Sequence, residues 1–152
     1  MSLTLVEDQK ISLVEKVSSA EELLRDIVTR HQSVVFASSL GAEDMVLTDL
    51  ILSRRLPIEI FTLDTGRLPA ETYDLLARLS EKYQYHLKVY CPDTVQLETY
   101  VRSKGINAFY ESVELRKECC RVRKVEPLKR ALAAEPGLQV LDADPQVRAQ
   151  AR

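Results

Sequence analysis

The chain has few of the sequence features that identify membrane-spanning, secreted, disulfide-rich or nucleic-acid-binding proteins. Its 152 residues include no tryptophan, four glycines and three cysteines, and aromatic residues make up 6%. No apolar run approaches the roughly 18 residues that cross a bilayer, and residues 1–10 lack the basic and then apolar stretches of a secretory signal. The net charge of -2 gives no overall attraction for nucleic acid or anionic lipid. We therefore expect a cytoplasmic protein that binds neither membranes nor nucleic acid.

The cysteines are too few and too closely spaced to form a disulfide framework. Cys119 and Cys120 are adjacent, and a bond between neighbours closes a strained small ring. Cys91 makes the count odd. In a reducing compartment three interpretations of the cysteines remain, namely metal ligation, redox chemistry and chance.

Short apolar runs alternate with helical patterns along the chain. Apolar residues recur at helical spacing in residues 1–30. Further on, the patterns predict strands at 33–38, 58–63 and 86–90, and helices at 42–54, 69–83, 94–103 and 118–133. This alternation is typical of an α/β fold, with a parallel sheet covered by helices on both faces. We assign residues 1–133 to this domain and leave the tail, 134–152, unassigned.

In such sheets ligands bind beyond the carboxyl ends of the strands, and two segments fall there. The first, residues 38–44 (SSLGAED), joins small residues to a helix start, which suits an anion such as phosphate or sulfate. It is not a P-loop, because the Gly-x-x-x-x-Gly-Lys spacing is missing. The alternative is a plain strand-to-helix turn with capping serines.

The second segment, residues 63–67 (LDTGR), places an acidic residue at the end of a strand. Asp64 there can bind ribose hydroxyls or a metal, and Arg67 can reach a phosphate with two donors. The alternative is an ordinary turn with an exposed arginine.

The third segment is basic and contains the adjacent cysteines. Residues 116–130 hold seven basic side chains against two acidic ones, a local charge of +5. Cationic neighbours stabilise thiolates, which zinc and iron–sulfur clusters require. The alternative is a solvated basic helix with two half-buried cysteines.

Taken in order, four motifs resemble those of the assimilatory sulfonucleotide reductase family, the adenylyl-sulfate and phosphoadenylyl-sulfate reductases. They are 38–44 (SSLGAED), 62–68 (TLDTGRL), 105–114 (GINAFYESVE) and 116–132 (RKECCRVRKVEPLKRAL). The resemblance covers about residues 30–133, and the last motif is the most specific. It implies an α/β nucleotide-binding fold of the adenine-nucleotide α-hydrolase (ATP pyrophosphatase-like) type.

The resemblance also implies an activity in sulfate assimilation. Members of the family reduce adenosine 5′-phosphosulfate, or its 3′-phosphorylated form, to sulfite and the adenosine nucleotide. A cysteine in a mobile C-terminal tail attacks the sulfate sulfur, and thioredoxin or glutaredoxin then releases sulfite. Members with a Cys-Cys motif carry a [4Fe-4S] cluster, held by that motif and a later Cys-x-x-Cys, and generally use the nucleotide without the 3′-phosphate. Cys119 and Cys120 place this chain in that branch.

Site residues follow position by position. The resemblance, with Arg67 added for its reach toward a phosphate, predicts these substrate-binding residues: Ser38, Ser39, Gly41, Leu63, Asp64, Gly66, Arg67 and Lys124. Those at 38–41 correspond to the loop that holds the phosphosulfate, and those at 63–66 to the adenosine-binding turn. Lys124 matches a lysine between cluster and substrate, where a buried ammonium would stabilise sulfate charge and tune the cluster. Cys119 and Cys120 match half of the cluster ligands.

The chain departs from the family after Leu132. No cysteine follows Cys120, so the later Cys-x-x-Cys pair and the catalytic cysteine are both missing, and residues 134–152 do not align with the family. We therefore expect a truncated or altered member, with no complete cluster and no turnover. A sheet without its later strands has an open edge, which favours a homo-oligomer.

Other functions stay open beside thioredoxin-dependent reduction of adenosine 5′-phosphosulfate. One is a non-catalytic adenine-nucleotide-binding module that keeps only the two loops, and another is a phosphoadenylyl-sulfate reductase. A nucleic-acid-binding role of the basic helix is disfavoured by the negative net charge and the few aromatic residues. An ATP pyrophosphatase is disfavoured because the Ser-Gly-Gly-x-Asp-Ser loop of that group is missing.

Overall fold

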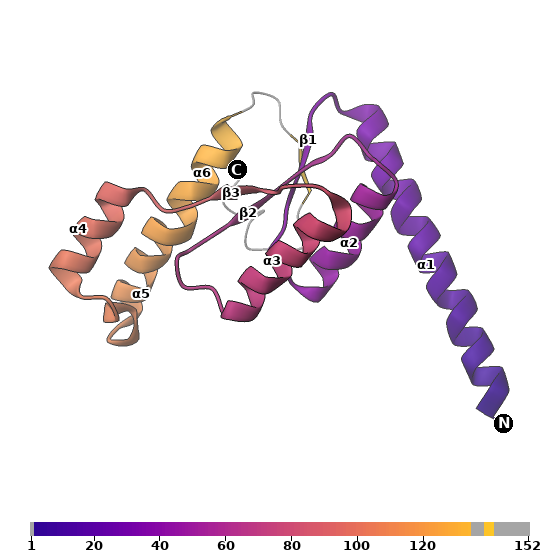
Figure 1. Cartoon of the computed structure of the whole chain (residues 1–152), viewed down its shortest axis with the longest axis horizontal. Coiled ribbons are helices and arrows are strands. Elements are labelled where there is room, and N and C mark those ends of the chain that lie inside the picture. Colours follow the sequence, from indigo (N-terminus) through magenta and orange to yellow (C-terminus); the bar gives the residue numbers. More distant parts are fainter. Residues whose placement is uncertain (1, 135–138, 142–152) are drawn as a thin grey trace.

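The computed structural model describes residues 2–134 and 139–141, and the side chains of residues 12–134 and 140–141. The described elements are shown in Figure 1 and occur in this order: α1 (Ser2–Arg30), β1 (Val34–Ala37), α2 (Ala42–Ser53), β2 (Glu59–Leu63), α3 (Ala70–Tyr83), β3 (Lys88–Tyr90), α4 (Thr94–Lys104), the 3₁₀ helix η1 (Ala108–Tyr110), α5 (Val113–Cys120), the π-helix η2 (Arg121–Val125), α6 (Glu126–Ala133) and β4 (Gln139–Leu141).

The described strands form one parallel sheet in the order β3-β2-β1-β4. Ala37 of β1 pairs with Phe61 of β2, and Phe36 pairs with Leu141 of β4 on the other side. The chain therefore builds outward from β1 through β2 to β3 and then returns to the far side of β1. Such a reversal of strand order marks the place where open α/β sheets bind ligands, beyond the carboxyl ends of the strands.

β4 is a strand that the sequence analysis did not predict. It has three residues and pairs with β1 through Val34, Val35 and Phe36. A run this short has no periodicity of its own, so its pairing partner defines it. β4 occupies the edge of β1, and the rest of the tail, apart from Ala134, lies outside the described residues.

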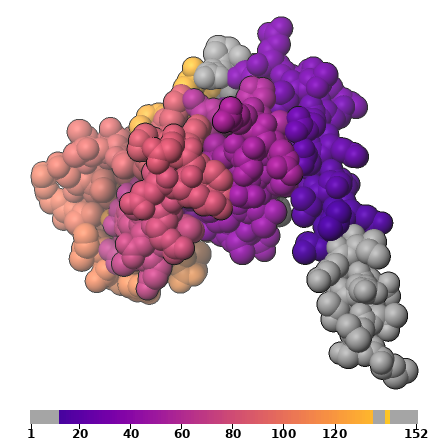
Figure 2. Space-filling view, turned by 45° about the vertical axis from the view of Figure 1, so that its right-hand side comes forward, coloured from indigo at the N-terminus to yellow at the C-terminus, as the bar shows by residue number. Residues whose placement is uncertain are grey.

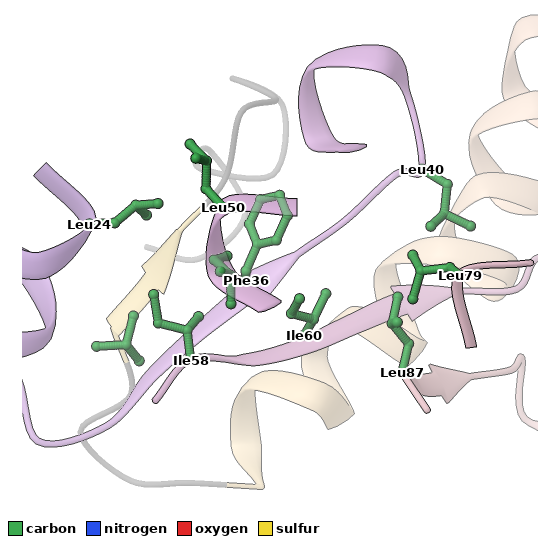
Figure 3. Packing of buried hydrophobic residues seen from close by; sticks show 10 residues of the cluster. Leu24, Phe36, Leu40, Leu50, Ile58, Ile60, Leu79 and Leu87 are labelled. Atoms are coloured by element: carbon green, nitrogen blue, oxygen red, sulfur yellow. The ribbon is translucent and has the colours of Figure 1, made fainter. Parts of the chain in front are cut away.

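One face of the sheet carries the larger apolar cluster. Phe36 and Ile60 point from β1 and β2 toward Leu24 of α1, Leu50 of α2 and Leu79 of α3 (Figure 3). All five side chains are buried. Burial of apolar area at about 25 cal/mol per Å² is the main stabilising contribution at such a site.

The opposite face is covered by α6. Val35 and Phe61, the strand neighbours of the previous pair, pack against Leu128 and Ala131. Alternate residues of a strand point to opposite faces, so continuous apolar runs fill both clusters. The expected α/β fold, with helices on both faces of a parallel sheet, is thus confirmed.

The helices α4 and α5 form a third small core beside the sheet. Tyr100, Ala108, Cys119 and Val122 are buried together. Figure 2 shows this part of the chain on the side of the molecule opposite α1. The helix expected at 118–133 is longer than predicted, since α5 begins after Ser112, whose side chain accepts a hydrogen bond from the Leu115 N–H.

This long helical stretch also changes its winding. Residues 121–125 form a π-helix between α5 and α6. A π-turn inserts an extra residue into the helical repeat and is frequent at functional sites. No helix in the described part of the chain is both long and apolar enough to cross a membrane.

Candidate functional site

The loop between β1 and α2 is held in shape by its own side chains. The Asp44 carboxylate accepts hydrogen bonds from the backbone N–H and the hydroxyl of Ser39, both at 2.6 Å. The Ser38 hydroxyl accepts from the Leu40 N–H at 3.2 Å, and the Ser39 hydroxyl oxygen accepts from the Gly41 N–H at 3.3 Å. Leu40 has a left-handed φ of 62°, which the surrounding bonds must sustain.

These bonds change the expected role of the loop backbone. The N–H groups of residues 38–41 all have acceptors inside the protein, that of Ser38 being the Phe61 carbonyl at 2.9 Å. The first bond within α2 runs from the Met45 N–H to the Gly41 carbonyl at 2.9 Å. The N–H groups of residues 42–44 therefore have no acceptor within the helix, as at any helix start. An anion at this edge would meet the start of α2 and not the amides of the two serines.

The turn after β2 is organised around Asp64. Its Oδ1 atom accepts hydrogen bonds from the Gly66 N–H at 2.7 Å and from the Tyr73 hydroxyl at 2.8 Å. Gly66 has a φ of 72°, in the region that favours glycine. The hydrogen bond to Asp64, followed by burial, raises the pKa of Tyr73. Leu63, the last residue of β2, is half-buried beneath this turn.

Tyr73 was not predicted as a site residue. It lies on α3, nine residues after Asp64, and no pattern in a single sequence joins a turn to the helix that follows it. Its hydroxyl fixes the carboxylate so that Oδ1 is occupied. No hydrogen bond from the described residues reaches Oδ2, which is the atom left for a ligand hydroxyl.

Arg67 points away from the role expected for it. Its guanidinium donates to the Ile106 carbonyl at 3.2 Å and to the Asn107 side-chain oxygen at 3.0 Å. It also lies over the Phe109 ring, 4.6 Å from the centroid. These contacts tie the turn to the loop after α4. Phosphate binding by Arg67 stays a prediction, and it would require the side chain to share or give up these contacts.

The two adjacent cysteines differ in environment. Cys119 is 8% exposed and packs with Tyr100 and Val122, whereas Cys120 is exposed. Two neighbouring thiols fit two of the four thiolate positions of a [4Fe-4S] cluster. Within residues 12–134 and 140–141, no group of three or more His, Cys, Asp or Glu side chains is placed to hold a metal ion. Cluster ligation by Cys119 and Cys120 stays a prediction.

Lys124 is exposed on η2. The sequence analysis expected a buried ammonium, but no described residue bonds it or pairs with it. It is thus a cation available to a ligand, next in sequence to a residue that reaches the turn after β2.

That residue is Arg123, which the sequence analysis counted only as part of a basic run. It is 6% exposed, and its Nη1 atom donates to the Thr65 carbonyl at 2.6 Å. A methyl group on Gly66 would lie 3.4 Å from the same Nη1 atom. Arg123 is buried next to Val122. A regular helix with one apolar stripe does not predict this, so no signal in the sequence would have singled out Arg123.

The structure therefore brings three predicted segments toward one edge of the sheet. The loop at 38–44 and the turn at 64–67 follow neighbouring parallel strands, and the cysteine-bearing helix reaches that turn through Arg123. A helix start, an acidic turn and an exposed lysine can receive an anion and hydroxyl groups. This combination, on a parallel sheet at its reversal point, defines a nucleotide-binding α/β domain.

Comparison with known proteins gives the family. Residues 33–141 match the phosphoadenosine phosphosulfate reductase domain, and the match includes β4. The match therefore continues past Leu132, where the sequence analysis ended the resemblance, as far as residue 141. The chain belongs to this family, which confirms the resemblance found in the motifs.

Individual relatives agree. The chain is 54% identical over 121 residues to an adenosine 5′-phosphosulfate reductase of Burkholderia cepacia, covering 80% of this chain and 48% of the relative. It is 50% identical over 124 residues to the protein of that name from Allochromatium vinosum, covering 82% and 48%. A third, from Neisseria meningitidis serogroup B, is 52% identical over 123 residues, covering 80% and 50%. The chain thus spans about half the length of these relatives.

Proposed function

We propose that this domain binds adenosine 5′-phosphosulfate, as part of the thioredoxin-dependent reduction of that nucleotide to sulfite and AMP in sulfate assimilation. The observation that carries the proposal is the placement of the loop at 38–44, the turn at 64–67 and the cysteine-bearing segment at one edge of the sheet. Relatives that are about 50% identical to this chain are named adenosine 5′-phosphosulfate reductases, which supports this nucleotide as the substrate.

The residues take separate roles in this proposal. The start of α2, framed by Ser38, Ser39 and Gly41, faces the phosphosulfate, and Lys124 supplies an exposed cation for the same group. At the turn after β2, the free Asp64 oxygen accepts from a ribose hydroxyl. Leu63 and Gly66 form the backbone against which the nucleoside lies.

The two cysteines are proposed as half of the cluster ligands. A [4Fe-4S] cluster held by four thiolates would carry a net negative charge, which the basic side chains of residues 116–130 would partly offset. Anaerobic reconstitution and an iron assay test what this chain holds. We expect well below about four irons per chain, because four thiolates are needed and the described residues offer one adjacent pair. About four irons per chain or per dimer would contradict this, and light scattering would show whether a homo-oligomer accompanies it. The cytoplasmic location stays a prediction.

The 3′-phosphorylated nucleotide is the main competing substrate. The Cys-Cys motif favours the nucleotide without this phosphate, and the relatives carry that substrate in their names. A module that binds nucleotide without reducing it is the other alternative.

Calorimetric titration of the anaerobically purified chain separates these proposals. We expect adenosine 5′-phosphosulfate to bind at least about tenfold more tightly than its 3′-phosphorylated form, a difference of about 1.4 kcal/mol. The reverse order would assign the chain to the phosphoadenylyl-sulfate branch. Binding of AMP as tight as that of the phosphosulfate would favour a nucleotide module. Binding of none of them would contradict a ligand site in this domain.

The role of Lys124 has its own matched control. Lys124→Ala removes an exposed cation next in sequence to Arg123, and we expect about a tenfold loss of affinity for the phosphosulfate, the value of one charge-assisted contact. Lys129→Ala removes an exposed lysine of the same basic run and should leave the affinity unchanged. Equal effects of the two substitutions would mean that the run acts only through its net charge.

A further inference from the structure

Arg123 is a buried cation without a matching anion. Its side chain is 6% exposed, and its Nε atom is fully buried with no hydrogen-bond partner among the described residues. No carboxylate of that part of the chain forms an ion pair with it. Burying a charge without a counter-ion costs free energy. We therefore expect a contact of Arg123 to account for its buried position.

Among the described residues, Arg123 makes one hydrogen bond, and it indicates what the side chain does. Nη1 donates to the backbone carbonyl of Thr65 at 2.6 Å, across 58 positions of sequence. Thr65 is itself buried, and its hydroxyl oxygen accepts from the Arg67 N–H at 3.2 Å. The guanidinium also lies near Gly66, where an added Cβ would be 3.4 Å from Nη1, an ordinary van der Waals contact. Arg123 thus holds the backbone of the turn in the middle, between Asp64 and Arg67.

The π-helix η2 explains how the side chain gets there. Val122 faces the small core that contains Cys119, while the next residue, Arg123, is buried toward the turn. Two consecutive residues are buried in different directions, and the residue after them is exposed. A π-turn inserts one residue into the helical repeat, and here that turn carries both buried residues, Val122 and Arg123.

We propose that Arg123 is a positioning residue, which sets the orientation of the Asp64–Arg67 turn from the helix that carries Cys119 and Cys120. It acts through the Thr65 carbonyl, and a side chain that is 6% exposed leaves little surface for a ligand. The part of this proposal that concerns nucleotides rests on the proposed function.

Three variants on the same π-turn test this. Arg123→Met keeps the volume and removes the charge and the donor, and exchange of a buried charge for a similar apolar side chain often leaves stability intact. Arg121→Met is the control, since Arg121 is exposed and makes one long contact of 3.5 Å to Gln96. Arg123→Lys restores a donor without the planar guanidinium.

Hydrogen exchange of the peptide spanning the turn is the first readout, because it needs no ligand. We expect its amides to exchange about tenfold faster in Arg123→Met, with the wild-type rate in Arg121→Met and an intermediate rate in Arg123→Lys. Urea denaturation accompanies the measurement, so that exchange through global unfolding is recognised. An unchanged exchange rate in Arg123→Met, in a protein that remains folded, overturns the proposal.

The second readout compares a charged with an uncharged ligand. A displaced turn weakens the binding of adenosine and of AMP by the same factor. In Arg123→Met we expect each affinity to fall about tenfold, so that the ratio of the two affinities stays unchanged. A loss confined to AMP would mean that Arg123 contacts the phosphate, which overturns its role as a positioning residue. If the wild-type chain binds neither ligand, the proposed function fails, while hydrogen exchange still decides the role of Arg123.

Discussion

Removing the Asp44 carboxylate should destabilise the loop between β1 and α2. In Asp44→Ala the Ser39 N–H and hydroxyl lose a charged acceptor, each at 2.6 Å. Hydrogen bonds to charged groups contribute about 1.5–3 kcal/mol each. Ser39 is exposed, so water replaces part of the lost hydrogen bonding. We therefore take the lower end of this energy range for each of the two bonds. We expect a loss of about 3 kcal/mol in the free energy of unfolding.

Thermal denaturation followed by circular dichroism measures this loss. For a chain of this size, 1 kcal/mol corresponds to about 2–4 °C, so the midpoint should fall by about 6–12 °C. Glu43→Ala is the control, because Glu43 is an exposed acidic residue in the same first turn of α2. Its change should stay within about 0.5 kcal/mol. If the two variants differ by less than about 1 kcal/mol, the carboxylate does not hold the loop and the reasoning fails.

Three further predictions follow from the geometry. Gly66→Ala should cost about 1–2 kcal/mol, because a Cβ disfavours the left-handed φ of 72°, and a urea midpoint equal to that of the wild type would contradict the strain. The hydrogen bond from Tyr83 is the main cause of the lowered pKa of Asp49. The stability that the Asp49 carboxylate contributes is therefore present above its ordinary pKa of 3.8 and is lost as the pH falls. Tyr83→Phe should lose less stability than the wild type between about pH 5 and about pH 2, and an equal loss in the two proteins, measured by urea denaturation, would refute this. Iodoacetamide should modify the exposed Cys120 before the buried Cys119 in the native protein, with equal rates in urea, as resolved by fragment-ion mass spectrometry; equal native rates would contradict the burial.

The parts of the fold that the sequence predicted are those with a strong local pattern. The apolar runs at β1 and β2 are buried on both faces, so each appears as a continuous stretch. β4 was missed because three residues carry no period. The π-turn was missed because its pattern differs from that of a regular helix by a single residue.

The candidate site was predicted in its location more than in its contacts. The rule about carboxyl ends of parallel strands selected the loop at 38–44 and the turn at 64–67. The sequence could not predict which polar groups remain available to a ligand, because this depends on contacts between distant segments. Arg67 is engaged by Asn107, 40 positions away, and Arg123 by Thr65, 58 positions away. A single sequence shows the charge of these residues but not the partner that uses it.

The position of β4 has a consequence for synthesis of the chain on the ribosome. β1 is complete once Ala37 has emerged, yet the strand that pairs along one of its edges begins at Gln139. During translation of the intervening residues, that edge of β1 presents unpaired N–H and C=O groups, which attract other strands. Contacts so distant in sequence also slow folding. Nascent chains halted just before residue 139 should therefore be the ones most prone to aggregate and most in need of a chaperone.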